Sequence, residues 1–170
     1  MEKKYILTDD VIDFNGHTLH RIKAVRDFDC VKAGDLGGFI ESEKNLDHDG
    51  DAWVTGDAVV SGDAWVTGDA VVTGSALVTG SAHVSGDARV TGSAQVTSNA
   101  DFAVIRGFGR VFRTTTFFRC KDNLVRCKCG CFYGTVDEFR SKVGETHGNS
   151  KYAKEYLMIA DLMELHFKED

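Results

Sequence analysis

A six-residue phrase recurs without interruption through residues 50–97, and it constrains the fold of this chain more than any other feature. Read from its aliphatic position the phrase is V-[TS]-G-[DS]-A-x, and its valines lie six residues apart: Val54, Val60, Val66, Val72, Val78, Val84, Val90 and Val96. A unit this short, with a Gly-Asp or Gly-Ser turn in it, has room for one short edge and one corner. Three edges close a triangular coil of about 18 residues, in which the valines stack inward on the next coil.

This pattern resembles the hexapeptide-repeat superfamily of left-handed parallel β-helices, whose motif places an aliphatic residue and a small residue at fixed positions in each hexad. The resemblance covers residues 50–97 closely and residues 38–103 in weakened form. It implies the left-handed winding, which the general rule for parallel crossovers would not give. Eleven hexads, counting the degenerate ones, predict a triangular prism of slightly under four coils.

The variable position of the hexad points outward and is apolar in the first half of the array: Trp53, Val59, Trp65, Val71 and Leu77. Apolar side chains on all three faces need cover, either from the terminal segments or from neighbouring prisms. We therefore expect a homo-oligomer. A homotrimer is favoured because the superfamily packs with three-fold symmetry and closed symmetry is the rule for oligomers.

Three segments flank the prism, and together they predict a mainly β protein with helices only at its C-terminal end. Residues 1–37 form short strands and turns, an N-terminal β cap, and residues 104–133 form a basic, aromatic β-hairpin. Residues 134–170 form a helical tail. Thr135 and Glu138 make a capping box for a first helix that ends near Gly144, and Asn149 or Ser150 caps a longer second helix.

Charge is distributed unevenly along the chain. The net charge is −6, which argues against a long nucleic acid as partner. Residues 104–128 carry seven basic residues and one acidic residue, or +6, which leaves −12 for the remainder. The N-terminus lacks the apolar core of a signal peptide and no apolar run is long enough to span a bilayer. We expect a cytoplasmic protein without a membrane partner, and the resemblance to phage proteins described below implies a bacterial host cell.

The five cysteines, an odd number, are crowded mainly into one region, which fits reduced thiols better than a disulfide framework. Cys127, Cys129 and Cys131 alternate along a strand, with Cys120 opposite. Zinc is the alternative, but C-x-C spacing on a strand holds the sulfurs apart, whereas a C-x-x-C turn brings them together. Packed thiols are favoured, and neither a metal nor another cofactor is expected.

The segment RGFGRVFRTTTFFR is the candidate ligand site. In a single strand Arg106, Phe108, Arg110 and Phe112 would interleave on one face, and Arg113 follows directly as a further phosphate-binding candidate. Arginine forks bind phosphate oxygens and aromatic rings stack on bases, so the segment suits a small anionic nucleotide. The alternative is that the arginines pair with the acidic prism or with the tail, and that the phenylalanines form the core of the junction.

The superfamily resemblance also implies a competing function. Many members are acyltransferases that use acyl-coenzyme A and a histidine base. His83 on the prism or His48 in its first stretch would take that role. No long loop interrupts the coils to wall off a substrate site, which weakens this hypothesis. A structural or protein-binding assembly module is the remaining alternative.

The stretch GDLGGFIESEKNLDHDGDAWV, the G-[DS]-A-x-V array and GCFYGTVDEF also resemble uncharacterised proteins of bacteriophages and prophages. Proteins of that setting with this architecture include oligomeric sponges that sequester nucleotide signals of host immunity between subunits. This resemblance implies a non-catalytic anti-defence sponge that binds a cyclic nucleotide or a related messenger. Trp53, Trp65 and His83 would then line a groove between subunits.

Overall fold

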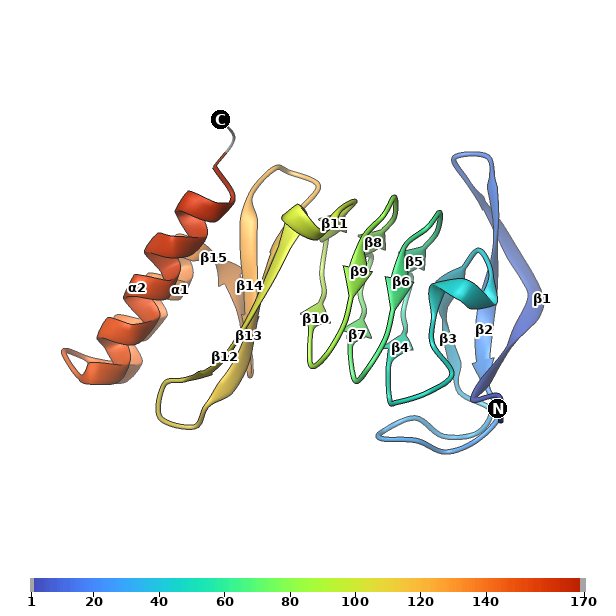
Figure 1. The fold of residues 1–170 in the computed structure, drawn as a ribbon, viewed down its shortest axis with the longest axis horizontal. Coiled ribbons are helices and arrows are strands. Elements are labelled where there is room, and N and C mark those ends of the chain that lie inside the picture. The colour runs from blue at the N-terminus through green and yellow to red at the C-terminus, as the bar shows by residue number, and fades with distance from the viewer. Residues whose placement is uncertain (1, 169–170) are drawn as a thin grey trace.

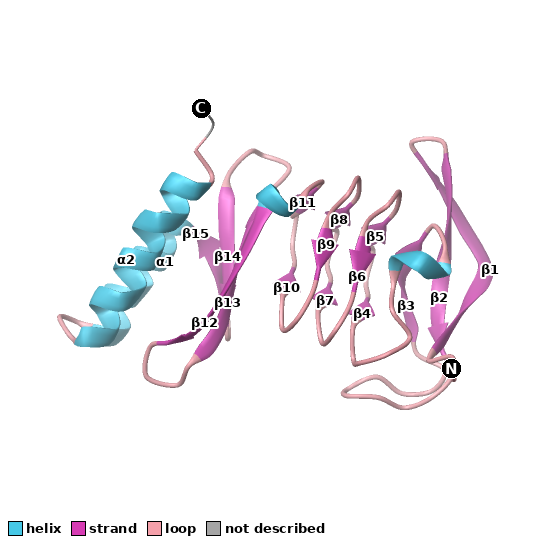
Figure 2. Cartoon of the chain, viewed as in Figure 1, coloured by secondary structure: helices cyan, strands magenta, loops and turns pink. Residues whose placement is uncertain are grey.

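The computed structural model describes residues 2–168 and shows four parts in sequence order along its long axis. An N-terminal antiparallel hairpin comes first, and stacked coils follow it (Figure 1). An antiparallel sheet comes next, and two helices close the other end. Within residues 2–168 the two α-helices lie at this C-terminal end, and the short cyan segments elsewhere in Figure 2 are single 3-10 turns. The mainly β fold predicted from the sequence is confirmed.

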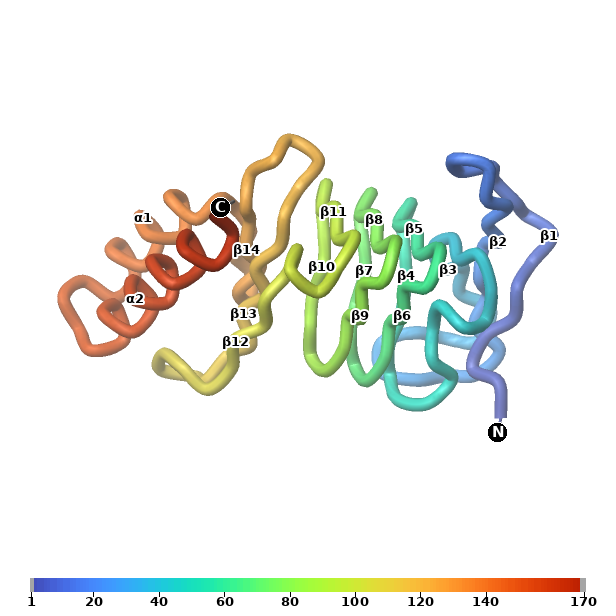
Figure 3. The backbone as a smooth tube through the Cα atoms, turned by 45° about the horizontal axis from the view of Figure 1, so that its top comes forward, coloured from blue at the N-terminus to red at the C-terminus, as the bar shows by residue number. Residues whose placement is uncertain are grey.

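The repeat forms a β-solenoid of about three turns, slightly shorter than expected, and its coils are visible as stacked loops of the backbone tube (Figure 3). Its edges are two-residue strands: β4 (Trp53–Val54), β5 (Val59–Val60), β6 (Trp65–Val66), β7 (Val71–Val72), β8 (Leu77–Val78), β9 (His83–Val84), β10 (Arg89–Val90) and β11 (Gln95–Val96). Each strand pairs in parallel with the strand three positions along, as Trp53 does with Val71 and Trp65 with His83. The three stacks of strands are the faces of the prism, and we call them by their strands below.

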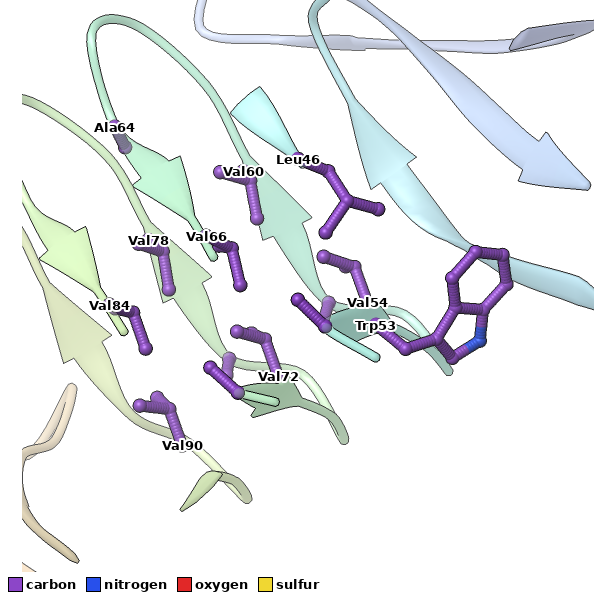
Figure 4. Close-up of a cluster of buried hydrophobic side chains, with 14 of the residues drawn as sticks. Leu46, Trp53, Val54, Val60, Ala64, Val66, Val72, Val78, Val84 and Val90 are labelled. Atoms are coloured by element: carbon purple, nitrogen blue, oxygen red, sulfur yellow. The ribbon is translucent and has the colours of Figure 1, made fainter. Parts of the chain in front are cut away.

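The interior of the solenoid consists of valine and alanine columns. All eight repeat valines and all eight repeat alanines are at most 1% exposed. Figure 4 shows the labelled valines pointing into the space between the faces, while Trp53 points away from them. Corner glycines such as Gly74 adopt left-handed backbone angles, here φ 74°, which a side chain would strain. The inward ladders predicted from the period are confirmed.

The N-terminal cap continues into the solenoid. β1 (Tyr5–Phe14) and β2 (His17–Ala24) form an antiparallel hairpin, and β3 (Leu36–Ile40) pairs with β2 on one side and with β5 of the solenoid on the other. A short 3-10 turn, Glu43–Asn45, follows. The sequence predicted two short strands within residues 4–14, but one strand with an irregularity between Leu7 and Val11 spans them.

This cap covers two of the five outward apolar residues. Trp53 is 5% exposed because it packs edge-on against Tyr5 and Phe28. Val59 is buried in a cluster with Leu19 and Phe39, from β2 and β3. Trp65 on the β6–β9 face remains 44% exposed. Terminal segments therefore cover some of the outward apolar residues, as expected from the sequence. The β6–β9 face is the least covered.

The C-terminal sheet differs from the expected strand pair. Its four antiparallel strands are β12 (Phe102–Phe108), β13 (Arg113–Arg119), β14 (Val125–Cys129) and β15 (Phe132–Thr135). Residues expected in one long strand form the β12–β13 hairpin, because Gly107 and Gly109 take left-handed angles and the chain turns at residues 109–112. Phe102, expected to continue the repeat, instead begins β12 after the 3-10 turn Asn99–Asp101.

The helices α1 (Val136–His147) and α2 (Lys151–His166) pack against this sheet. The capping box of Thr135 and Glu138 and the cap by Ser150 are present as predicted. The first helix runs through Gly144 rather than ending there. None of the helices within residues 2–168 combines the length and apolar character needed to cross a membrane.

Candidate functional site

A cavity of about 420 Å³ lies where the C-terminal sheet meets the helices, and it is the candidate ligand site. Its size falls in the range usual for small-molecule sites, about 300–1,000 Å³. The β12–β13 turn, the β14–β15 turn and both helices supply its walls. The lining residues are Arg110, Val111, Arg113, Cys129, Cys131, Phe132, Phe139, Lys142, Val143, Thr146, His147 and Tyr156.

The β12–β13 turn is held on α2 by two hydrogen bonds. The backbone N–H of Gly109 donates to Glu155 Oε2 over 2.9 Å, and the Tyr156 hydroxyl donates to the carbonyl of Phe108 over 3.4 Å. A side chain at Gly109 would collide with the Tyr156 hydroxyl, so glycine lets the turn lie this close. These contacts place Arg110 at the mouth of the cavity.

The β14–β15 turn positions Arg113, and again a glycine allows the close approach. Gly130, between Cys129 and Cys131, has φ 57° and lies directly against the Arg113 guanidinium, where a Cβ would leave no room. Thr115 donates a hydrogen bond to the sulfur of Cys129 over 3.1 Å. Arg113 therefore packs on the glycine of the β14–β15 turn, and the hydrogen bond from Thr115 ties β14 to β13.

The lining is cationic. Arg110, Arg113 and Lys142 line the cavity, and its lining contains no carboxylate. Within the described residues 2–168, neither Arg110 nor Arg113 forms a salt bridge, while Lys142 contacts Glu145 at 3.1 Å on the surface. Burial raises the pKa of Tyr156, and the neighbouring Cys129 raises it further, so the hydroxyl stays protonated at neutral pH. The cavity thus presents cations beside aromatic walls.

The arrangement separates the arginines and phenylalanines predicted to share one strand face. Arg106, on β12, pairs with Asp87 at a corner of the solenoid. Arg110 and Phe112 lie in the turn, and Arg113 begins β13. Phe108 and Phe112 are 43% and 67% exposed and do not line the cavity. The hairpin is the reason, because a turn cannot present the alternating face of a strand.

The two tryptophans also lie outside this cavity. Trp53 lines a second hollow of about 500 Å³, next to Arg89 and between the prism and the loop after β2, with Asp29, Asp35 and Asp51. Trp65 stacks on His83 with ring centroids 4.8 Å apart and planes 9° from parallel. The structure thus distributes the predicted site residues over several separate places, and only Arg110 and Arg113 among them line the cavity.

The two histidines considered as catalytic bases have local partners. His83 Nε2 lies 3.2 Å from the Thr67 hydroxyl, and its ring covers Trp65. His48 stacks on Tyr5 at 4.3 Å and its Nδ1 accepts a hydrogen bond from the backbone N–H of Lys4. His48 thus helps to pack the N-terminal cap, and neither ring lines one of the two cavities described here.

The cysteines fall into different environments. Cys120 closes the end of the solenoid and is paired by a β-bridge with Ala94. Cys127 is buried in the second core, and burial raises the pKa of its thiol far above the ordinary value. Cys129 and Cys131 line the cavity. Over residues 2–168, no three histidine, cysteine or acidic side chains form a group that could hold a metal ion.

The six lining residues on the helices escaped the sequence reasoning: Phe139, Lys142, Val143, Thr146, His147 and Tyr156. The helices themselves were predicted, and the spacing of Lys142 and Thr146 puts them on one helical face. No sequence signal showed that this face would meet the β12–β13 turn. Comparison with known proteins adds no further assignment, since the sequence matches no protein-family model and no curated protein sequence.

Proposed function

We propose that this protein is a non-catalytic binding protein that sequesters a small phosphorylated ligand, and that the cavity beside α1 holds it. One observation carries the proposal: three cationic side chains from two different elements converge on a cavity whose described lining has no acidic group. Guanidinium forks donate paired, charge-assisted hydrogen bonds to phosphate oxygens, and the ammonium of Lys142 adds a third positive charge.

The proposed ligand class is a cyclic nucleotide or a related messenger. Phe132 and Phe139 supply aromatic surface in the same cavity as the cations, and aromatic rings stack on any base. The resemblance to phage and prophage proteins supplies the biological setting, a sponge that removes an immune signal. In this proposal Arg110 and Arg113 keep the phosphate-binding role expected from the sequence, while Arg106 loses it to Asp87.

The proposal includes self-association into a closed oligomer, with a trimer as the expected form. Trp65 supports it, because a tryptophan 44% exposed on the open β6–β9 face loses water-exposed apolar surface when a second copy covers it. This observation also favours the second candidate function, an assembly module in which the prism faces bind protein and the cavity stays empty.

Native mass spectrometry with a ligand pool tests the proposal. The pool contains cyclic dinucleotides, ADP-ribose, acetyl-coenzyme A and inorganic phosphate, and the spectrum also counts subunits. We expect an intact nucleotide to be retained and released unchanged by heat. An oligomer that retains nothing would favour the assembly module, and acyl transfer from the coenzyme would contradict a non-catalytic role.

Two single variants and a matched control locate the site. We expect Arg110→Ala and Arg113→Ala each to weaken binding roughly tenfold to a hundredfold, the loss of one charged hydrogen-bonding group. Arg106→Ala removes the same side chain from a position outside the cavity and should leave the affinity unchanged. Equal losses in all three variants would indicate general electrostatics rather than this cavity.

A further inference from the structure

The turn that joins β12 and β13 exposes a compact apolar patch, which we call the hairpin tip and define as residues 107–112. Phe108, Val111 and Phe112 are 43%, 57% and 67% exposed. Single exposed apolar residues are ordinary, but three large ones within five positions gather exposed apolar surface at one turn. The cavity does not account for the two phenylalanines, which do not line it.

The backbone of the hairpin tip holds these side chains outward. Gly107 and Gly109 have φ 92° and 73°, and Phe112 has φ 54°, a left-handed angle that a phenylalanine rarely adopts. Hydrogen bonds to Glu155 and Tyr156 fix the turn on α2. Phe112 is thus presented to solvent by a strained but anchored turn.

The surroundings of the hairpin tip are basic. Arg110 belongs to it and Arg113 follows it, both without a salt bridge among residues 2–168. Lys151, in the first turn of α2, contacts the same Glu155 that binds Gly109. A partner for this surface must accept apolar side chains and carry negative charge beside them, although the chain as a whole has net charge −6.

The interface of a bilayer that contains anionic lipid has this combination. Apolar and aromatic side chains enter the boundary between headgroups and acyl chains, and flanking cations are attracted to the negative surface. An acidic protein surface would match the charge but offers no general apolar phase for three protruding side chains. A nucleic acid offers phosphates and base faces but no apolar phase that would also take up the aliphatic side chain of Val111.

We propose that the hairpin tip docks the protein peripherally on membranes rich in anionic phospholipid. Phe108, Val111 and Phe112 enter the acyl boundary, and the positive charges of Arg110 and Arg113 attract the anionic membrane surface without having to leave the cavity. This inference goes beyond the proposed function and departs from the expectation of no membrane partner, which rested on the lack of a spanning segment. Peripheral docking needs no such segment.

Cosedimentation with vesicles tests the inference, using phosphatidylcholine vesicles with and without phosphatidylserine. The full chain should bind only the vesicles with phosphatidylserine, and less in high salt. Phe112→Asn removes the apolar ring while asparagine tolerates the left-handed angle, so the fold is kept. It should weaken vesicle binding roughly tenfold. Leu36→Thr, at a 58% exposed position of the N-terminal cap, should have no effect.

Three results would overturn the inference: no vesicle binding by the full chain, unchanged binding by Phe112→Asn, or equal loss in Leu36→Thr. A fall in subunit number in Phe112→Asn without vesicle binding by the wild-type chain would assign the hairpin tip to a second copy instead. The nucleotide assay separates the two proposals. If the sponge hypothesis alone is wrong, vesicles bind and the ligand pool does not. If the membrane inference alone is wrong, Phe112→Asn and the wild-type chain both retain the nucleotide and neither binds vesicles.

Discussion

The solenoid, residues 50–97, and the C-terminal unit, residues 102–167, are built on opposite plans. Every coil of the solenoid repeats the same buried valines, buried alanines and corner glycines. The C-terminal unit repeats nothing, and its core of aromatic and aliphatic side chains combines four strands with two helices. The six-residue period that predicts the fold lies in the first region, and the cationic cavity lies in the second.

This difference shows where a repeat can place a site. In the solenoid a residue meets its equivalent in the next coil, as Trp65 meets His83, so a face is a column of similar positions. A pocket for one ligand needs unlike groups on several sides. Such groups come together where a non-repeating segment is present: the loop after β2 lies against the prism at the second hollow, and a turn, a sheet edge and a helix meet at the cationic cavity.

The largest expected effect comes from placing a charge in the uniformly apolar interior of the solenoid. Val72 is fully buried between Val54 and Val90 in one stack of strands. We expect Val72→Asp to lower the free energy of unfolding by about 3–5 kcal/mol, since a carboxylate without a partner is placed in an apolar core. Urea unfolding followed by circular dichroism measures it. Ser75→Asp, at an exposed corner, is the control and should change stability little.

A second pair of variants separates backbone strain from crowding between coils. Gly74 and Gly86 have similar left-handed angles, but a Cβ at Gly74 would lie 2.9 Å from the nitrogen of Gly92, whereas one at Gly86 would meet nothing within 4 Å. We expect Gly86→Ala to cost about 1 kcal/mol from strain alone, and Gly74→Ala to cost roughly twice as much. If thermal unfolding shows the same loss of stability in both variants, neighbouring coils move apart at their corners to accommodate the added methyl group.

The N-terminal cap differs from both regions because it buries a charged side chain, and the effect of that charge on stability can be measured. Lys4 is fully buried, and desolvation lowers its pKa to about 8. Between that value and the ordinary pKa near 10.5 the unfolded chain holds the proton and the folded chain does not, so this lysine makes stability rise with pH there. Lys4→Met should remove that rise and stabilise the protein at pH 7 by about 1–2 kcal/mol.

Unfolding of both proteins at pH 7, 8 and 10 measures the Lys4 effect as a difference, which cancels the other titrating groups. The Nζ of Lys4 approaches the Gly50 carbonyl at 3.3 Å. Destabilisation by Lys4→Met at pH 7 would therefore mean that this bond outweighs the desolvation of the charge.

The smallest expected effect is confined to the C-terminal unit. Arg140 on α1 reaches Asp161 and Glu164 on α2, and this pairing lowers the pKa of Glu164. Arg140→Ala should speed hydrogen exchange in α2 several-fold while leaving the solenoid amides unchanged, because exposed ion pairs contribute little to global stability. Acidification through the carboxyl range should produce the same local loosening in the wild-type chain. Faster exchange in the solenoid would show that the two regions unfold together.

The sequence predicts the solenoid in more detail than it predicts the C-terminal unit. The period of six predicts the parallel pairing, the inward valines and the corner glycines, and the structure contains all three. Its end was harder to place, because Ala100 and Phe102 keep the spacing by residue type although Phe102 begins β12. A match of residue types at one hexad does not reveal whether the chain continues around the coil or leaves it.

The candidate site was predicted only in part. Arg110 and Arg113 were expected to bind phosphate and do line the cavity, which fits that role without testing it. The strand that was to carry them proved to be a hairpin, since two glycines two residues apart permit a turn as readily as a strand irregularity. Lys142 and Tyr156 could not be placed there from sequence, because the docking of a helix on a sheet depends on contacts distant along the chain.

The parallel pairing of each solenoid strand with the strand three positions along has a consequence for the length of the molecule. Three hexads form one coil, so inserting or deleting three hexads would bring every face back into register. The two ends would move apart or together by about 4.8 Å, the spacing of neighbouring strands. The number of coils therefore sets the separation between the N-terminal cap and the cavity in fixed steps, and a tandem sequence can change that separation without redesigning either end.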